Sequence, residues 1–399
     1  MTDKIVRFRE LYAIPSGNGL SRPSSVRGTG YRMINMGELF AHDIIGDIEM
    51  ERVQMNDKEK QKFFVEEGDL LFARQSLVAA GAGKCSIVKT ISEPTTYESH
   101  LIRVRLNRQT CSPWFYYYLF RLPDNPVKSI INQCAQAGIR GSDLAKVKVP
   151  LPPLPTQRKI AKVLSAYDDL IENNTKRIRI LERMIELGYK AIAGVSRLKE
   201  KEVRLSSIIQ IVRGLSYSSD EIERQEGVRL INLKNINAFG GFRADGTKWY
   251  SGKYKTEQIV GCGDLVMGVT DMTQDRRTVG SVALIPTTSA TSVISADLIK
   301  IESKIDKVFL YAMFRFGGVS KYIALFANGA NVLHLRPQCV LKVKVQLPAD
   351  EEIARYVRFA RPLVAEINSC NSQNALLARQ RDLLLPRLMS GKLSVEGVG

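Results

Sequence analysis

The fold of this chain depends on the stretch Leu151-Pro-Pro-Leu-Pro-Thr-Gln-Arg-Lys-Ile160, where a short strand-like run changes to a long helical run. Proline has no N–H to donate to a sheet, so Pro152 and Pro153 end the preceding strand. Thr156 is a residue type that commonly caps a helix, so we expect the helix to begin there. The stretch therefore predicts the end of a globular domain and the start of a helix.

The residues that follow alternate in spacing between four and three, which is the 3.5-residue period of a coiled-coil seam. This stripe consists of Ile160, Leu164, Tyr167, Ile171, Asn174, Ile178, Leu181 and Ile185. A second stripe near the C-terminus consists of Ile353, Val357, Ala360, Val364, Ile367, Cys370, Leu377 and Leu384. The polar Asn174 is of the kind that fixes register. A lone stripe is an ordinary core face, but two matched stripes predict that the helices pair.

Self-comparison shows that the chain contains two copies of one unit. Val6-Arg7-Phe8 matches Val203-Arg204-Leu205, and Gly30-Tyr-Arg-Met-Ile-Asn-Met36 matches Gly227-Val-Arg-Leu-Ile-Asn-Leu233. Val147-Lys-Val-Pro-Leu-Pro152 returns as Val343-Lys-Val-Gln-Leu-Pro348. The order is kept and the offset is nearly constant, so chance is a poor explanation.

The repeat predicts a mixed α/β, or α+β, fold with two globular domains that are each followed by a long helix. Short β-like runs such as 102–106 and an aromatic helix-like segment at 114–122 support this class. We expect domain 1 over residues 1–150, a central helix over 151–195, domain 2 over 196–348, and a C-terminal helix and tail over 349–399. Each helix leaves its domain through the same strand, so we expect an antiparallel pair with pseudo-twofold symmetry.

The composition favours a polyanionic partner. The net charge is +17, and the excess of positive charge is spread over both repeats. Such a balance suits nucleic acid, because each neutralised phosphate releases counterions. The six cysteines are scattered, only three histidines are present, and no signal segment or membrane span is evident, so we expect a cytoplasmic protein without a zinc site.

The sequence contains no recognisable catalytic motif. An adenine methyltransferase needs Asn or Asp before a Pro-Pro-aromatic run, and the one Pro-Pro here is Pro152-Pro153 between leucines. The Gly81-Ala-Gly-Lys84-Cys85 run lacks the upstream glycine and the hydroxyl residue of a phosphate-binding loop. His42, His100 and His334 are too far apart in sequence to propose a triad or metal cluster. We therefore expect no catalytic residues, no metal and no cofactor.

Candidate DNA-binding residues lie where a strand should end and a loop begin. Arginine, glutamine and asparagine suit the reading of base edges because they present paired donors or acceptors. The candidates are Arg74, Gln75 and Ser76 in the first repeat, and Thr270, Asp271, Arg276 and Arg277 in the second. Cations that match between the repeats suit phosphate contacts, namely Arg140 with Arg336 and Lys146 with Lys342. The plain alternative for the loop candidates is a solvated surface loop. The plain alternative for the matched cations is a structural role.

The chain resembles the specificity subunits of type I restriction-modification systems. The resemblance rests on 151–160 with its Gln157, on the following Leu164-Ser-Ala-Tyr-Asp-Asp-Leu-Ile171, and on Leu383-Leu-Leu-Pro-Arg-Leu-Met-Ser-Gly391. It implies two target-recognition domains, each reading half of a split asymmetric site on double-stranded DNA. It also implies that Gln157 and the residues of the helical stripes either pair the two helices with each other or dock two methyltransferase subunits. Two motor-nuclease subunits are implied in the restricting complex. The second repeat has Leu347-Pro-Ala-Asp-Glu-Glu352 in place of the fuller motif.

Two other classes of function stay open from the sequence. One is a repeat-containing DNA methyltransferase whose motifs are not recognised, and methyl-donor binding by the isolated chain would favour it. The other is a coiled-coil adaptor that binds proteins, and DNA binding that ignores sequence and salt would favour it.

Overall fold

The computed structural model describes residues 4–76, 81–133, 137–195, 201–223, 226–288 and 290–395. The chain divides into two compact units. Unit 1 is Met1–Ile171 with Ala375–Gly399, and unit 2 is Glu172–Asn374. Each of the two long helices therefore contributes one part to each unit.

Unit 1 is built on a five-stranded sheet with the order β2-β10-β6-β8-β4. Its strands are Tyr12–Asn18, Leu101–Leu106, Leu70–Ala73, Cys85–Val88 and Ile44–Ile45. A second sheet has the order β5-β3-β9, from Glu51–Val53, Arg27–Ile34 and Thr95–Tyr97. The smaller sheets are β1–β13 (Lys4–Arg7 and Lys148–Leu151) and β11-β12-β7 (Asn132–Gln133, Ala137–Gly138 and Gln75–Ser76). The short helices are α1 (Met36–Ala41), α2 (Asp57–Phe63), α3 (Pro113–Phe120) and α4 (Gly141–Leu144).

Unit 2 has a four-stranded sheet with the order β15-β24-β20-β22. Its strands are Ile209–Arg213, Leu298–Ser303, Leu265–Gly268 and Val282–Leu284. The sheet β16-β18-β17-β23-β19 contains Ile222–Glu223, Lys248–Tyr250, Val228–Ile231, Ser292–Ile294 and Ile259–Val260. The two-stranded sheets are β14–β26 (Lys201–Arg204 and Lys344–Leu347) and β21–β25 (Thr270–Asp271 and Leu333–His334). The short helices are α6 (Lys307–Phe316), α7 (Val319–Ala324) and α8 (Pro337–Lys342).

The strand pairing confirms the repeat that the sequence predicts. Lys4 pairs with Leu151 in unit 1, and Lys201 pairs with Leu347 at the matching place in unit 2. The parallel pair β3–β9 likewise matches β17–β23. Each unit also has its own apolar core, in which the aromatic helix α3 or its counterpart α6 is buried. The mixed α/β class is therefore confirmed.

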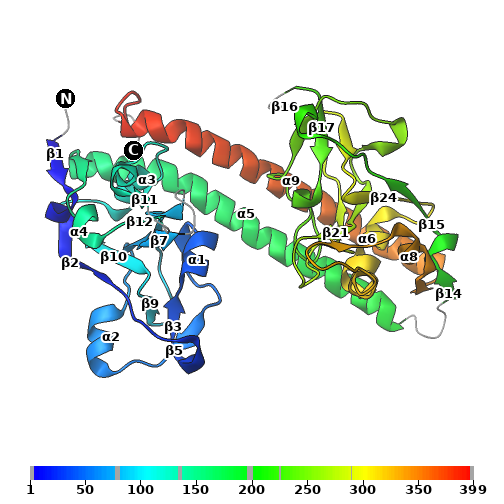
Figure 1. The fold of residues 1–399 in the computed structure, drawn as a ribbon, viewed down its shortest axis with the longest axis horizontal. Helices are drawn as coiled ribbons and strands as arrows, with labels where there is room; N and C mark the ends of the chain where they lie inside the picture. The colour runs from blue at the N-terminus through cyan, green and yellow to red at the C-terminus, as the bar shows by residue number, and fades with distance from the viewer. Residues whose placement is uncertain are drawn as a thin grey trace. The chain divides into compact units, whose positions relative to one another are not determined.

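The long helices are α5 (Leu154–Val195) and α9 (Asp350–Met389), and they pack against each other in opposite directions (Figure 1). In unit 2 the Asn174 side-chain amide donates to Asn374 at 3.0 Å. Farther along α5, the Ile185 carbonyl accepts from the Tyr356 hydroxyl at 3.2 Å. Rising numbers on α5 meet falling numbers on α9, so the predicted antiparallel pairing is confirmed.

The first helix starts earlier than Thr156, so the predicted cap is wrong. Helix α5 begins at Leu154 and includes Pro155 in its first turn, where a missing N–H leaves no internal hydrogen bond unmade. Gln157 is fully buried. Its amide accepts from the Ser112 N–H at 2.8 Å and donates to the Pro152 carbonyl at 2.7 Å. Gln157 thus fastens the helix start to its own unit, and its side chain is not free to dock a partner.

The predicted stripes mostly face inward. Ile160, Leu164, Ile185, Ile353, Ala360 and Cys370 are buried, and Tyr167, Ile171, Asn174, Ile178, Leu181, Val357, Val364, Ile367, Leu377 and Leu384 are partly buried. The sequence prediction missed Tyr356, Leu385 and Leu388, which are also buried. In the described part of the chain, no helix is long and apolar enough to cross a membrane.

Candidate nucleic-acid interface

In unit 1 the structure brings together two of the segments in which DNA-binding residues are predicted. Strand β7, which contains Gln75 and Ser76, pairs with β12, and Arg140 follows β12 as the residue before α4. The Arg74 N–H donates to the His100 carbonyl at 2.8 Å, and its carbonyl accepts from the Ile139 N–H at 2.9 Å. Residues 74–76, His100 and 137–140 therefore form one continuous edge, and both arginine side chains on it are exposed.

Unit 2 repeats this edge with different side chains. The Val269 N–H donates to the Asp297 carbonyl at 2.8 Å, and the Val269 carbonyl accepts from the Leu335 N–H at 2.8 Å. Strand β21 pairs with β25, and the exposed Arg336 precedes α8 as Arg140 precedes α4. These bonds make Val269 the counterpart of Arg74, and Thr270 the counterpart of Gln75.

The equivalent positions carry equivalent side-chain contacts. The Gln75 amide nitrogen lies 2.5 Å from Nδ1 of His100 in unit 1. The Thr270 hydroxyl donates to the Asp297 carboxylate at 2.9 Å in unit 2. The backbone frame is the same, but the side chains on it differ: Gln75 lies beside the exposed His100 in unit 1, and the buried Thr270 lies beside the partly buried Asp297 in unit 2. Such a difference suits two domains that read different base sequences.

The predictions for 74–76 and 270–271 need correction in their local structure. Both segments are strands rather than loops, because each pairs with a second strand across the edge. Arg74 is exposed, but its counterpart Val269 is buried, so the two copies do not match as charged positions. Thr270 and Asp271 are also buried, which leaves the side chain of Asp271 inside the unit.

Asp271 organises the loop that follows it. Its carboxylate accepts from the Thr273 N–H and hydroxyl, from the Thr278 N–H and from the Val279 N–H, at 2.6 to 3.1 Å. Burial favours the protonated acid, but the donors from Thr278 and Thr273 outweigh it and hold the pKa of Asp271 below its ordinary value. Asp271 is therefore an ionised anchor for residues 271–279, and not a group that can reach a base.

The predicted cations lie on the surface. Lys146 is exposed and lies 3.6 Å from Asp143, and Lys342 is exposed in the last turn of α8. Arg277 is exposed and paired with Asp275 at 2.7 Å, while Arg276 is partly buried and has a φ of 52°. Exposed ion pairs of this kind are weak, so phosphate groups can compete for these side chains.

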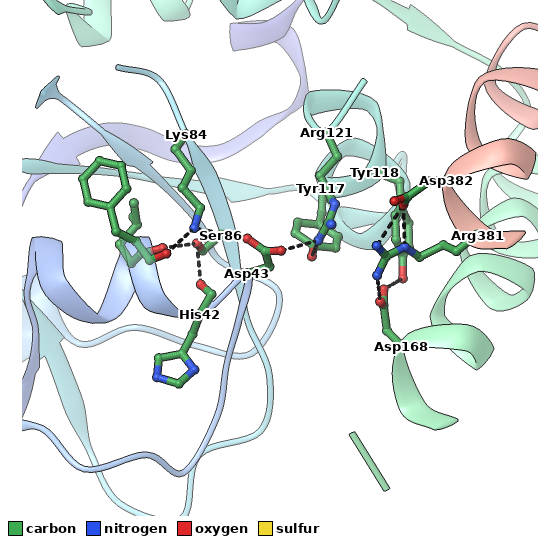
Figure 2. Close-up of polar contacts among 12 residues, drawn as sticks. His42, Asp43, Lys84, Ser86, Tyr117, Tyr118, Arg121, Asp168, Arg381 and Asp382 are labelled. Carbon is green, nitrogen blue, oxygen red and sulfur yellow. Dashed lines mark hydrogen bonds and ion pairs between the residues drawn. The ribbon is translucent and has the colours of Figure 1, made fainter. Parts of the chain in front are cut away.

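A polar network that the sequence did not reveal lies in unit 1 (Figure 2). Arg121 donates to Asp43 at 2.9 Å and to the Tyr117 hydroxyl at 2.5 Å, and Lys84 lies 3.1 Å from Asp43. Burial opposes ionisation of Asp43, but Arg121 and Lys84 together lower its pKa. The network joins the turn after α1 to β8 and α3, so it has a structural role.

A second part of this network holds the C-terminal helix. The Tyr118 hydroxyl donates to Asp168 at 2.5 Å, and Arg381 donates to the other oxygen of the same carboxylate. Burial and the neighbouring Asp168 raise the pKa of Tyr118, so the phenol keeps its proton and stays a donor. Figure 2 shows Arg381 between Asp168 and Asp382, and the three residues come from α5 and α9. No pattern in the sequence joins residues so far apart.

Across the described residues, no group of three His, Cys, Asp or Glu side chains is placed to hold a metal ion. The fold and the interface define the class of this chain: a duplicated α/β protein with two matched edges, carried on paired antiparallel helices.

Comparisons with known proteins agree with this class. A family model described as the type I restriction modification DNA specificity domain matches residues 25–183. The chain is 22% identical to the type I restriction enzyme MjaVIII specificity subunit of Methanocaldococcus jannaschii, over 75% of each protein. It is 24% identical to the MjaIX specificity subunit of the same organism, over 71% of this chain and 69% of that one.

A solved structure shares the fold. The crystal structure of the type I restriction-modification S subunit from M. genitalium superposes with a TM-score of 0.60 at 13% identity, covering 97% of this chain and 99% of that one. The family model matches residues 25–183, and the likeness to the MjaVIII specificity subunit extends over 75% of the chain. The structure from M. genitalium shows that the fold is shared.

Proposed function

We propose that this chain is the non-catalytic DNA-recognition subunit of its restriction-modification complex, and that each unit reads one half of a split, asymmetric site. The observation that carries the proposal is the matched edge in the two units. The same backbone bonds present Gln75 with His100 in unit 1, and Thr270 with Asp297 in unit 2. One frame with different side chains on it is what two different half-sites require.

The charged residues of each edge suggest two roles, contact with phosphates and reading of bases. Arg140 and Arg336 are exposed at the same place in both units, so they suit phosphates, which position a domain without reading sequence. We assign the same role to Lys146 and Lys342. Arg74, Gln75 and Ser76 in unit 1, and Arg276 and Arg277 in unit 2, are the base-reading candidates. We reassign Asp271 as the anchor of its loop, and Thr270 as a polar group of the edge.

The likeness to specificity subunits also suggests the partners. The relatives are named as specificity subunits of type I restriction enzymes. We infer that two methyltransferase subunits dock on the helical region, that motor-nuclease subunits complete the restricting complex, and that α5 and α9 together fix the distance between the half-sites. Helix α5 contributes to both units, which supports the idea of a spacer.

Co-expression with the methyltransferase subunit tests the proposal. We expect adenine methylation at one split asymmetric site in the host genome, and none when either subunit is expressed alone. Gln75→Ala should relax the sequence requirement in one half-site and leave the other half unchanged. Methylation by the chain alone would favour the methyltransferase alternative, and methylation without any sequence preference would contradict the reading of half-sites.

A further inference from the structure

Two residues of the described part of the chain have a strained backbone, and both lie at one place in unit 2. In the described part of the chain, Phe239 and Arg276 are the non-glycine residues with positive φ, at 63° and 52°. This left-handed region of φ/ψ space is unfavourable for residues other than glycine. Backbone strain of this kind concentrates at functional sites. The Phe239 N–H donates to the Arg277 carbonyl at 2.7 Å, so the turn that contains Phe239 rests on the loop that contains Arg276.

This site presents large apolar side chains to solvent. Phe239 is 58% exposed and Met272, on the same loop as Arg276, is 71% exposed. More than half of the Phe239 side chain faces solvent, so it gains little from packing, and its positive φ costs conformational energy. The turn therefore holds Phe239 outward against both of these preferences.

The surroundings hold the loop in place and set two arginines beside the site. Asp271 anchors the loop from one end, and Gln274 donates to the Ala330 carbonyl at 2.9 Å, just before β25 and Arg336. Arg276 and Arg277 flank the site, and Nε of Arg276 is buried without a hydrogen-bond partner. The strained turn is thus continuous with the edge that we propose to bind DNA.

We propose that Phe239 is a wedge that inserts between two stacked bases of the half-site bound by unit 2, beside the base-reading candidates Arg276 and Arg277. DNA-bending proteins insert Phe, Met and Leu side chains between base steps in this way. The inference rests on the proposed function, because it needs unit 2 to bind a half-site. In the described part of unit 1, no non-glycine residue has a positive φ, so we assign the wedge to unit 2 alone.

The test uses the full chain and short duplexes that carry its own site, with 2-aminopurine replacing each adenine in turn. Binding should increase the fluorescence at one position in one half-site, because unstacking removes the quenching. Phe239→Ala should abolish this increase and weaken binding about tenfold, which corresponds to roughly 1.4 kcal/mol. Phe40→Ala is the matched control, since Phe40 is an exposed phenylalanine of unit 1. It should leave the increase intact.

A second variant separates the wedge from a folding defect. Phe239→Gly relieves the strained φ, so it should raise the melting temperature while also abolishing the fluorescence increase. The wedge is overturned if no position brightens with the wild-type chain, or if either Phe239 variant keeps the increase. It is also overturned if Phe239→Ala weakens only the binding of a methyltransferase subunit. Equal binding of specific and scrambled duplexes would instead reject the proposed function, and the wedge with it.

Discussion

Arg381 on α9 and Asp168 on α5 form an ion pair inside unit 1, with side-chain exposures of 10% and 7%. Tyr118 donates to the same carboxylate, so helix α3 is joined to both long helices. A buried charge that loses its partner destabilises a protein far more than an exposed one does. This pair therefore fastens the C-terminal helix to the first unit.

Arg381→Ala should destabilise unit 1 by about 3–5 kcal/mol, because it leaves the Asp168 carboxylate buried and unpaired. Denaturant unfolding, followed by a probe placed in unit 1, measures the change. Lys89→Ala is the control in the same unit, since Lys89 and Asp169 form a partly exposed pair at 2.9 Å and its loss should cost less than about 1 kcal/mol. Equal effects of the two substitutions would mean that Arg381 has no special role.

The end of α9 should contribute to the core of unit 1. Leu385 is buried at 4% exposure, while Leu383 on the same helix is 56% exposed. Leu385→Ala should destabilise unit 1 by about 2–5 kcal/mol through the cavity that it leaves. Leu383→Ala should change stability by no more than about 0.5 kcal/mol. Hydrogen exchange resolved by segment checks that the protection lost lies in unit 1, and loss confined to unit 2 would contradict the packing.

Arg140 and Arg336 should contribute affinity without contributing sequence preference. Replacing either with alanine should weaken DNA binding and reduce the slope of log K against log salt by about 1, the signature of one lost phosphate contact. Titrations at several salt concentrations measure the slope, and methylation mapping measures the preference. Lys176→Ala serves as the control on the helix, where Lys176 pairs with Glu172. A change in the bases recognised would show that the arginines read sequence.

The anchor at Asp271 should make unit 2 sensitive to acid. Its pKa is depressed in the folded state, so its contribution is fully present above the ordinary value of 3.8 and is lost as the pH falls through the folded value. Asp271→Asn should lower the stability of unit 2 by about 1–3 kcal/mol at pH 7, because charge-assisted hydrogen bonds are lost. The gap from wild type should close below about pH 4.

Thermal melts across this pH range measure the effect. Asp275→Asn is the matched control in the same loop, since Asp275 is 64% exposed and should have little influence. A gap between wild type and Asp271→Asn that stays constant down to pH 2 would show that the ionised carboxylate is not what holds the loop.

The spacer proposal predicts a change in the site that is methylated. Four helix-forming residues inserted between Asn174 and Ile178, matched by four between Cys370 and Gln373, should lengthen the pair by about 6 Å. The unspecified gap should grow by one or two base pairs, since one step is about 3.4 Å. Insertion in α5 alone is the control, because it breaks the contact of Asn174 with Asn374. An unchanged gap with full activity would exclude the helices as a spacer.

Much of the architecture could be predicted from local patterns. The 3.5-residue spacing from Ile160 to Ile185 predicts a paired helix because the period itself places those side chains on one face. The repeat predicts two matched domains because the same order of strands and turns must fold in the same way. These properties depend on neighbouring residues, so a single chain displays them directly.

What the sequence determined by itself is therefore the class of fold, the duplication, the helix pairing and the positive charge that favours DNA. The tertiary structure alone decided which polar groups meet. It paired Asp168 with Arg381, turned the expected loop at Gln75 into a strand beside β12, buried Gln157 and Asp271, and placed Phe239 against Arg277. The physical reason is that these contacts join residues far apart in the chain, and their burial depends on the completed packing of each unit.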